Sequence, residues 1–195
     1  RKIDEYLTSI GLNLGSDYNA SAGHLSTNYR FTVPTKNPEH VETVIKIISD
    51  ISHKLTLEPE AFERERKIVE EEWRKQYGNN KRYFEEIKQY LYKNSIFLNR
   101  DPIGKIDVIQ NFKYQDVIDY YQKWYQPELM SVFVIGDIDT DNIENLIEKY
   151  FKDIKNTPVK LPDYKIPNYT EKQFFTFQDD EQTNISFSIF EKNKF

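Results

Sequence analysis

With 195 residues, the chain is long enough for one ordinary domain, or for one domain and a piece of another. Its residues are 38% hydrophobic and 30% charged, which is polar for a globular protein, although the 15% of aromatic residues can still build a core. A net charge of −5 with scattered Lys and Arg argues against nucleic acid as a partner, no apolar run reaches membrane-spanning length, and the lack of cysteine excludes disulfides and thiolate metal sites.

The first third of the chain predicts two helices with extended segments between them. Residues 3–10 have the spacing of a short amphipathic helix, which Gly11 ends. Residues 17–20 then lead into an extended segment, and the alternation in 29–33 is typical of a strand. The next helix begins at Asn37-Pro38, a cap followed by a first-turn proline. Its apolar face consists of Val41, Val44, Ile45, Ile48 and Ile51.

A Glu-rich helix is predicted over 59–77, because proline suits a first turn and no breaker follows until residue 78. At 100° per residue, Phe62, Val69, Trp73 and Tyr77 share one apolar stripe. Glu63, Glu70 and Glu71 point away from that stripe, whereas Glu65 and Glu72 point into it. A carboxylate on a packed face is costly unless a metal ion, an Arg or a protonated His pairs with it. The alternative is that both acids lie at the edge of the face and reach water or a Lys.

The remaining elements complete a mixed pattern of helices and strands. Further helices are predicted after residue 80, over 116–125 and over 139–151, with a loop at 99–111 between the first two. Strands are predicted at 129–135, 174–177 and 185–189. Together these elements indicate the α+β class, with a mostly antiparallel sheet and helices packed on one face.

Four stretches of the chain resemble the insulinase/pitrilysin-type zinc metallopeptidases, the M16 family. They are Ile10-Gly11 followed by residues 17–20, the Glu-rich helix, residues 100–104 (RDPIG), and residues 121–137, in which a helix, a proline break and a strand follow one another. The insertion around residues 11–17 is similar to the bacterial processing-protease branch that includes PqqL-like proteins.

The resemblance implies a zinc site and a peptide substrate. Family members bind zinc through a His-x-x-Glu-His motif and a distal Glu, which corresponds here to Glu72. An acid two turns earlier, matching Glu65, braces the site by hydrogen bonding. Asn19 and Ala20 match the edge strand to which a peptide adds as an extra strand. Because the helical wheel had already singled out Glu65 and Glu72, we favour the metal-site interpretation over the solvent one.

The His-x-x-Glu-His motif itself is absent from the chain. The histidines are His24, His40 and His53, and none of them forms it; a lone histidine such as His24 is usually a loop or surface residue. The resemblance places the motif, with its general base, upstream of Arg1, so we expect no catalytic residue in this chain and no activity or tight zinc site for the chain alone. Either the chain lacks upstream residues of its parent, through trimming or omission, or the parent is an inactive family half. Retention of Glu65 and Glu72 favours an active parent.

Three functions therefore compete. The first is a fragment of a zinc metalloendopeptidase, periplasmic or cytoplasmic by family resemblance. The second is a non-catalytic M16 half that encloses a substrate chamber or binds a partner subunit. The third, an unrelated α+β interaction module, does not explain the ordered matches.

The domain expectation follows from the same resemblance. Residues 1–157 are expected to be the remainder of a catalytic-type unit, 158–169 the linker, and 170–195 the start of the following unit. Strands cut off from their own helices expose an apolar face and an open edge. We therefore expect the tail either to pair with another copy of the chain or to be poorly ordered. The rest of the parent peptidase and a peptide substrate are the other expected partners.

Overall fold

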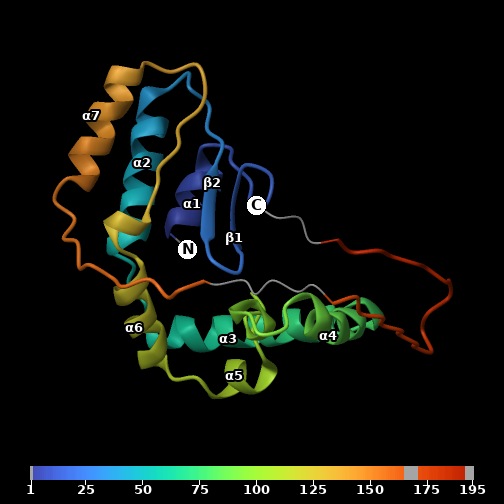
Figure 1. The fold of residues 1–195 in the computed structure, drawn as a ribbon. Coiled ribbons are helices and arrows are strands. Elements are labelled where there is room, and N and C mark those ends of the chain that lie inside the picture. Colours follow the sequence, from blue (N-terminus) through green and yellow to red (C-terminus); the bar gives the residue numbers. More distant parts are fainter. Residues whose placement is uncertain (1, 165–170, 192–195) are drawn as a thin grey trace.

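The computed structural model describes residues 2–164 and 171–191 (Figure 1). A β-hairpin and the helices beside it form one part, and a long helical arm forms the other (Figure 1). In chain order the elements are α1 (Lys2–Ser9), β1 (Tyr18–Ala22), β2 (Thr27–Phe31), α2 (Pro38–His53), α3 (Pro59–Gln76), α4 (Asn79–Leu91), the 3-10 helix η1 (Ile96–Asn99), α5 (Ile106–Asn111), α6 (Tyr114–Trp124), the 3-10 helix η2 (Pro127–Leu129) and α7 (Thr140–Phe151).

The hairpin is antiparallel, with Tyr18 opposite Phe31, Ala20 opposite Tyr29 and Ala22 opposite Thr27. Paired residues project to the same side of a sheet, so the Tyr18 and Phe31 rings stack on one face, with centroids 6.3 Å apart. Before the hairpin, Gly11 has φ +85°, a conformation that glycine adopts without the strain of a side chain, and it turns the chain out of α1.

The core lies where α1, α2 and the hairpin meet. It is built from the buried side chains of Leu7, Leu12, Tyr18, Val44 and Ile47. The predicted cap of α2 is present, because the Asn37 side chain accepts a hydrogen bond from the Glu39 N–H at 3.1 Å. Only part of the predicted apolar stripe of α2 is fully buried.

Helix α7 packs against α2 on the side away from the hairpin (Figure 1). The Ser49 hydroxyl donates to the Tyr150 carbonyl at 2.7 Å, near the end of α7. Lys149 and the Tyr150 hydroxyl both bond Glu42 Oε1 at 2.7 Å. These hydrogen bonds hold the pKa of Glu42 below its usual value and help to fix α7 against α2.

The arm consists of α3 and α4, joined at Gly78 and running one after the other below the hairpin (Figure 1). The predicted loop at 99–111 was wrong in part, because residues 106–111 form α5, which packs on α3. A six-residue helix is too short for a reliable periodic signal. Contacts with α3 hold it in place.

The predicted strand at 129–135 was wrong. Residues 127–129 form η2, and residues 130–135 belong to no strand, with Phe133 84% and Ile135 94% exposed. The segments 174–177 and 185–189 also form no strand. A strand needs a neighbour to accept and donate its backbone hydrogen bonds, and within the described residues only β1 and β2 pair. The α+β class is nevertheless confirmed, as a small antiparallel sheet flanked by helices.

Candidate metal and peptide-binding site

Helix α3 carries the two predicted site carboxylates. Its first turn is set by Pro59, and the Phe62 N–H bonds the Glu58 carbonyl at 3.0 Å. Its aromatic side packs by edge-on contacts of Phe62 with Phe112 and Tyr114, at centroid distances of 5.2 and 5.7 Å. These ring contacts set the rotation of α3 about its own axis.

Arg66 ties this side of α3 to α5. Its guanidinium donates to the carbonyls of Ile109 and Phe112, where the carbonyls at the end of α5 lack helical partners. It also lies over the rings of Phe62 and Phe112, at 4.6 and 4.3 Å, and its side chain is only 11% exposed. Sequence reasoning missed this residue, whose signal was a cation one turn after an aromatic on the apolar stripe.

Glu65 and Glu72 lie on one side of α3, as expected for residues two turns apart. The prediction that they point into a packed face was wrong, because both are exposed and α3 has no buried residue. The packed side is set by Phe62 and Arg66, which meet α5, and the Glu65–Glu72 side is left to solvent. Glu72 Oε1 accepts a hydrogen bond from Gln76 Nε2 at 3.3 Å. Because Glu65 and Glu72 are exposed, neither carboxylate needs a bound metal to offset the cost of burying its charge.

The described residues do not form a complete metal site. Within them no group of three or more His, Cys, Asp or Glu side chains is placed to hold an ion. The histidines lie apart from Glu72 in the chain: His24 in the hairpin turn, His40 at the start of α2, and His53 at its end, where Nδ1 lies 2.6 Å from the Ser49 carbonyl. Zinc sites in proteins require three or four such ligands. The described residues therefore do not provide enough ligands for a zinc site by themselves.

Asn19 and Ala20 lie on β1, and both are exposed. The Ala20 N–H donates to Asn19 Oδ1 at 2.9 Å. That N–H is consequently outside the β1–β2 ladder, as expected for the outer edge of β1. At the start of that edge the Tyr18 carbonyl accepts from the Gly15 N–H at 2.8 Å, in an isolated bridge with Leu14, and within the described residues no further strand pairs with it. An incoming peptide carbonyl could replace the Asn19 side chain as the acceptor for this N–H.

The C-terminal segment docks on α4. Phe175 and Phe177 contact the ring of Tyr83, at centroid distances of 6.1 and 5.5 Å. Arg82 forms a two-pronged ion pair with Asp179, Nε to Oδ2 at 2.6 Å and Nη2 to Oδ1 at 2.8 Å, and reaches Glu181 at 2.8 Å. These bonds with Arg82 are the main reason that the pKa of Asp179 is lowered. The tail expected to be unpartnered is therefore anchored through alternate residues.

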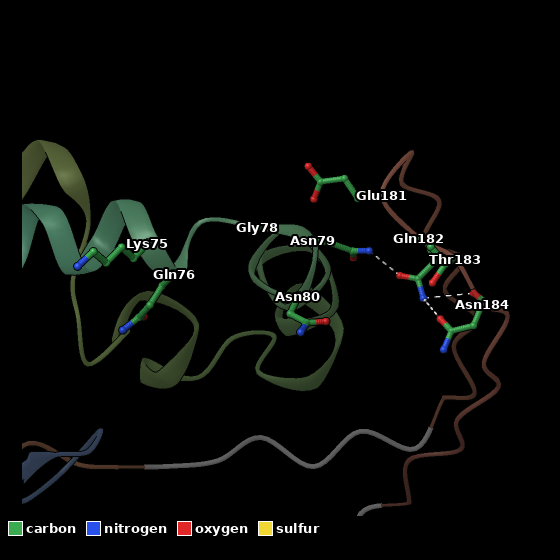
Figure 2. A pocket seen from close by; sticks show the side chains of 9 residues that line it. All are labelled: Lys75, Gln76, Gly78, Asn79, Asn80, Glu181, Gln182, Thr183 and Asn184. Atoms are coloured by element: carbon green, nitrogen blue, oxygen red, sulfur yellow. Dashed lines mark hydrogen bonds between the residues drawn. The ribbon is translucent and has the colours of Figure 1, made fainter. Parts of the chain in front are cut away.

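A polar cavity of about 440 Å³ opens between this segment and the junction of α3 and α4 (Figure 2). It begins about one turn beyond Glu72. The Asn79 amide donates to Gln182 Oε1 at 2.7 Å across one side of it (Figure 2). Its lining consists of Lys75, Gln76, Gly78, Asn79, Asn80, Glu181, Gln182, Thr183 and Asn184. Amide and hydroxyl groups dominate this lining, so it offers hydrogen bonds but no nucleophile paired with a base.

Two protein-family models match the chain. The model described as Insulinase (Peptidase family M16) matches residues 1–98, and the one described as Peptidase M16 inactive domain matches residues 111–194. The probable zinc protease PqqL of Haemophilus influenzae is 28% identical over 97% of this chain and 21% of its own length. The zinc protease PQQL-like of Arabidopsis thaliana is 31% identical over 96% of this chain and 20% of its own length.

A solved structure is similar as well. The first half of the periplasmic protease PqqL from Escherichia coli superposes with a TM-score of 0.80 at 29% identity, covering 85% of this chain and 36% of that one. The chain spans about a fifth of the length of the two curated relatives.

Proposed function

Because the chain belongs to peptidase family M16, we propose that it is part of a zinc-dependent metalloendopeptidase that hydrolyses peptides. The observation that carries this proposal is the similarity to zinc proteases along almost the whole chain. Since those relatives are about five times longer, the chain's partner is the rest of its parent protein. The periplasmic location of the Escherichia coli protease supports the same compartment here.

In this proposal Glu72 is a zinc ligand and Glu65 braces the site. Two features support these roles: the carboxylates share one exposed side of α3, and Arg66 holds a different side of the same helix against α5. A metal site whose ligands come from several segments needs an accessible carboxylate on a helix that is held in place. When bound, zinc would supply Lewis acidity and a water of lowered pKa. The remaining ligands and the general base would come from other parts of the parent.

The outer edge of β1 is proposed to bind the substrate as an added strand. Ala20 offers a backbone N–H on that edge, and Asn19 already shows the acceptor position that a peptide carbonyl would take. Main-chain hydrogen bonds of this kind give affinity without demanding a particular side chain. A broad range of extended peptides would therefore fit this edge.

A second candidate is a non-catalytic family half that encloses a substrate chamber or binds a partner subunit. The observation that favours it is the match of residues 111–194 to a domain described as inactive. The chain itself also lacks a His-x-x-Glu-His sequence.

Hydrolysis of a quenched fluorescent peptide by the full-length parent separates the two candidates. The peptidase proposal predicts turnover that stops with a zinc chelator and returns with added zinc, and no turnover by the 195-residue chain alone. A folded full-length protein that binds no zinc and cleaves no peptide would instead identify the non-catalytic half.

A further inference from the structure

The hairpin that carries the proposed peptide-binding edge is anchored along one face. At its base, Tyr18 is buried and stacks with Phe31. In its middle, the Tyr29 hydroxyl meets the Tyr125 hydroxyl at 2.7 Å, just after the end of α6. Burial and this hydrogen bond raise the pKa of Tyr29, so the phenol stays protonated and able to bond. Both contacts lie on a face of the hairpin and leave the edge of β1 at Ala20 uncovered.

The tip of the hairpin is anchored by His24. The turn closes with a hydrogen bond from the Gly23 N–H to the Ser26 carbonyl at 2.8 Å, and His24 lies inside that turn. Its Nδ1 bonds the Arg100 carbonyl. Its ring meets Phe97 of η1 and Tyr92 edge-on, at centroid distances of 5.5 and 6.2 Å. The imidazole thus joins the hairpin tip to the segment that follows α4.

We infer that His24 is a positioning residue that fixes the edge of β1 for peptide addition. This inference rests on the proposed function, because it gives His24 a role in presenting Asn19 and Ala20. An isolated two-stranded hairpin is only marginally stable in water, so its edge is rigid only where packing makes it so. The hairpin turn lies next to Ala22, the last residue of β1, and loss of the tip anchor leaves that end of the edge free to move. A fixed edge loses less conformational entropy when a peptide binds.

Two substitutions separate the hydrogen bond from the ring. His24→Phe keeps an aromatic ring against Tyr92 and Phe97 but removes the N–H. His24→Asn keeps a donor close to the Nδ1 position but removes the ring. Amide hydrogen exchange across β1 and β2, in the 195-residue chain, reports the anchor directly. We expect faster exchange in 19–22 for His24→Phe, partial or full recovery for His24→Asn, and unchanged exchange in the core helices α1 and α2.

The matching binding measurement is an NMR titration of the same variants with a short capped peptide of alternating serine and valine. The wild-type chain should show shifts at the amides of β1. His24→Phe should bind roughly fivefold more weakly, the change in affinity that corresponds to the free energy of one hydrogen bond, and its thermal midpoint should fall as well, because the lost bond joins the hairpin to Arg100. A purely structural role would lower the thermal midpoint and leave the affinity of the folded protein unchanged.

The outcomes distinguish the two proposals. If the wild-type peptide shifts appear in β1 and His24→Phe alters neither exchange nor affinity, the role of His24 is overturned while strand addition stands. If no peptide shifts β1 in the wild type, the proposed substrate edge is wrong, and the positioning role falls with it.

Discussion

Arg66 fixes the rotation of α3, and with it the side on which Glu65 and Glu72 lie. A guanidinium can cap two carbonyls and stack on two rings at once, which no other side chain does equally well. Arg66 thus influences the position of the proposed zinc ligand through its bonds to the carbonyls of Ile109 and Phe112. This arrangement separates the packed side of the helix from its chemically available side.

Arg66→Ala should lower the free energy of unfolding by about 2–3 kcal/mol, because it leaves two carbonyls without a charged donor and removes two ring contacts. Urea unfolding followed by circular dichroism measures this change. Arg64→Ala, on the exposed side of the same helix, is the matched control and should cost less than about 0.5 kcal/mol. Equal effects of the two substitutions would show that Arg66 does not hold α3 to α5.

At the scale of elements, α4 is the docking surface for the C-terminal segment, residues 171–191. Phe175, Phe177 and Asp179 alternate along the chain and all reach α4, while Phe174 between the linker and this run is 92% exposed. The spacing is that of an extended strand with one docked side. The segment therefore meets α4 through the side chains of one of its sides.

A charge swap between Arg82 and Asp179 tests whether their ion pair holds the segment on α4. Arg82→Glu should release residues 175–182 and raise their amide exchange, and combining it with Asp179→Arg should restore protection, because the pair is regenerated with opposite polarity. Hydrogen-exchange mass spectrometry of the tail peptides is the measurement. Arg74→Glu, a reversal on exposed α3, should leave the tail unchanged. Absence of rescue in the double variant would mean that the ion pair does not hold the segment.

The same contact should depend on pH in one direction. Since Arg82 lowers the pKa of Asp179 from 3.8, the pair's contribution is fully present above pH 3.8 and is lost as pH falls through the lower value of the folded state. Protection of the amides of residues 175–182 from exchange, corrected for intrinsic rates, should therefore persist until the pH reaches the lowered pKa of Asp179. Loss of protection at clearly higher pH would assign the docking to another group.

At the scale of the whole molecule, a two-stranded sheet is flanked by helices, and apolar side chains remain at the surface. Several large apolar side chains within residues 130–135 and 185–190 are exposed, among them Phe133, Ile135, Phe187 and Ile189. Exposed apolar segments of this kind mark surfaces that another part of a protein covers. The similarity to the first half of a larger protease supports the parent protein as the source of that cover.

The linker expected at 158–169 gives a proteolysis prediction; residues 165–169 lie outside the described part. The segment entering it is held, because the Thr157 N–H bonds Gln126 at 2.7 Å and the Val159 N–H bonds Glu128 at 2.8 Å. Trypsin should therefore cut after Lys160 before it cuts after Lys155, as mass spectrometry of early time points would show. Lasting resistance after Lys160 in a monomeric sample would place the unit boundary elsewhere.

Local signals predicted the helices well, and non-local contacts explain the failures. The cap at Asn37 and the first-turn proline of α3 act within one turn, so the sequence alone identifies them. The segment at 129–135 has a strand's composition, but a strand exists only where distant residues pair with it. The helical wheel placed Glu65 and Glu72 together correctly, yet it could not tell which side of α3 would meet α5. The contact of His24 with residues after α4 crosses 76 positions and has no local signal.

Zinc retention by the full-length parent tests the central claim most directly. Glu72→Gln, which exchanges an anionic ligand for a neutral one, should abolish retention of the metal after dialysis, as measured by native mass spectrometry. Glu65→Gln should weaken retention by roughly 10–100-fold, the usual effect of losing a group that braces a ligand. Glu71→Gln, next to Glu72 and paired with Arg74, should keep a full complement of zinc. Full zinc in Glu72→Gln, or loss of zinc in Glu71→Gln instead, would contradict the account.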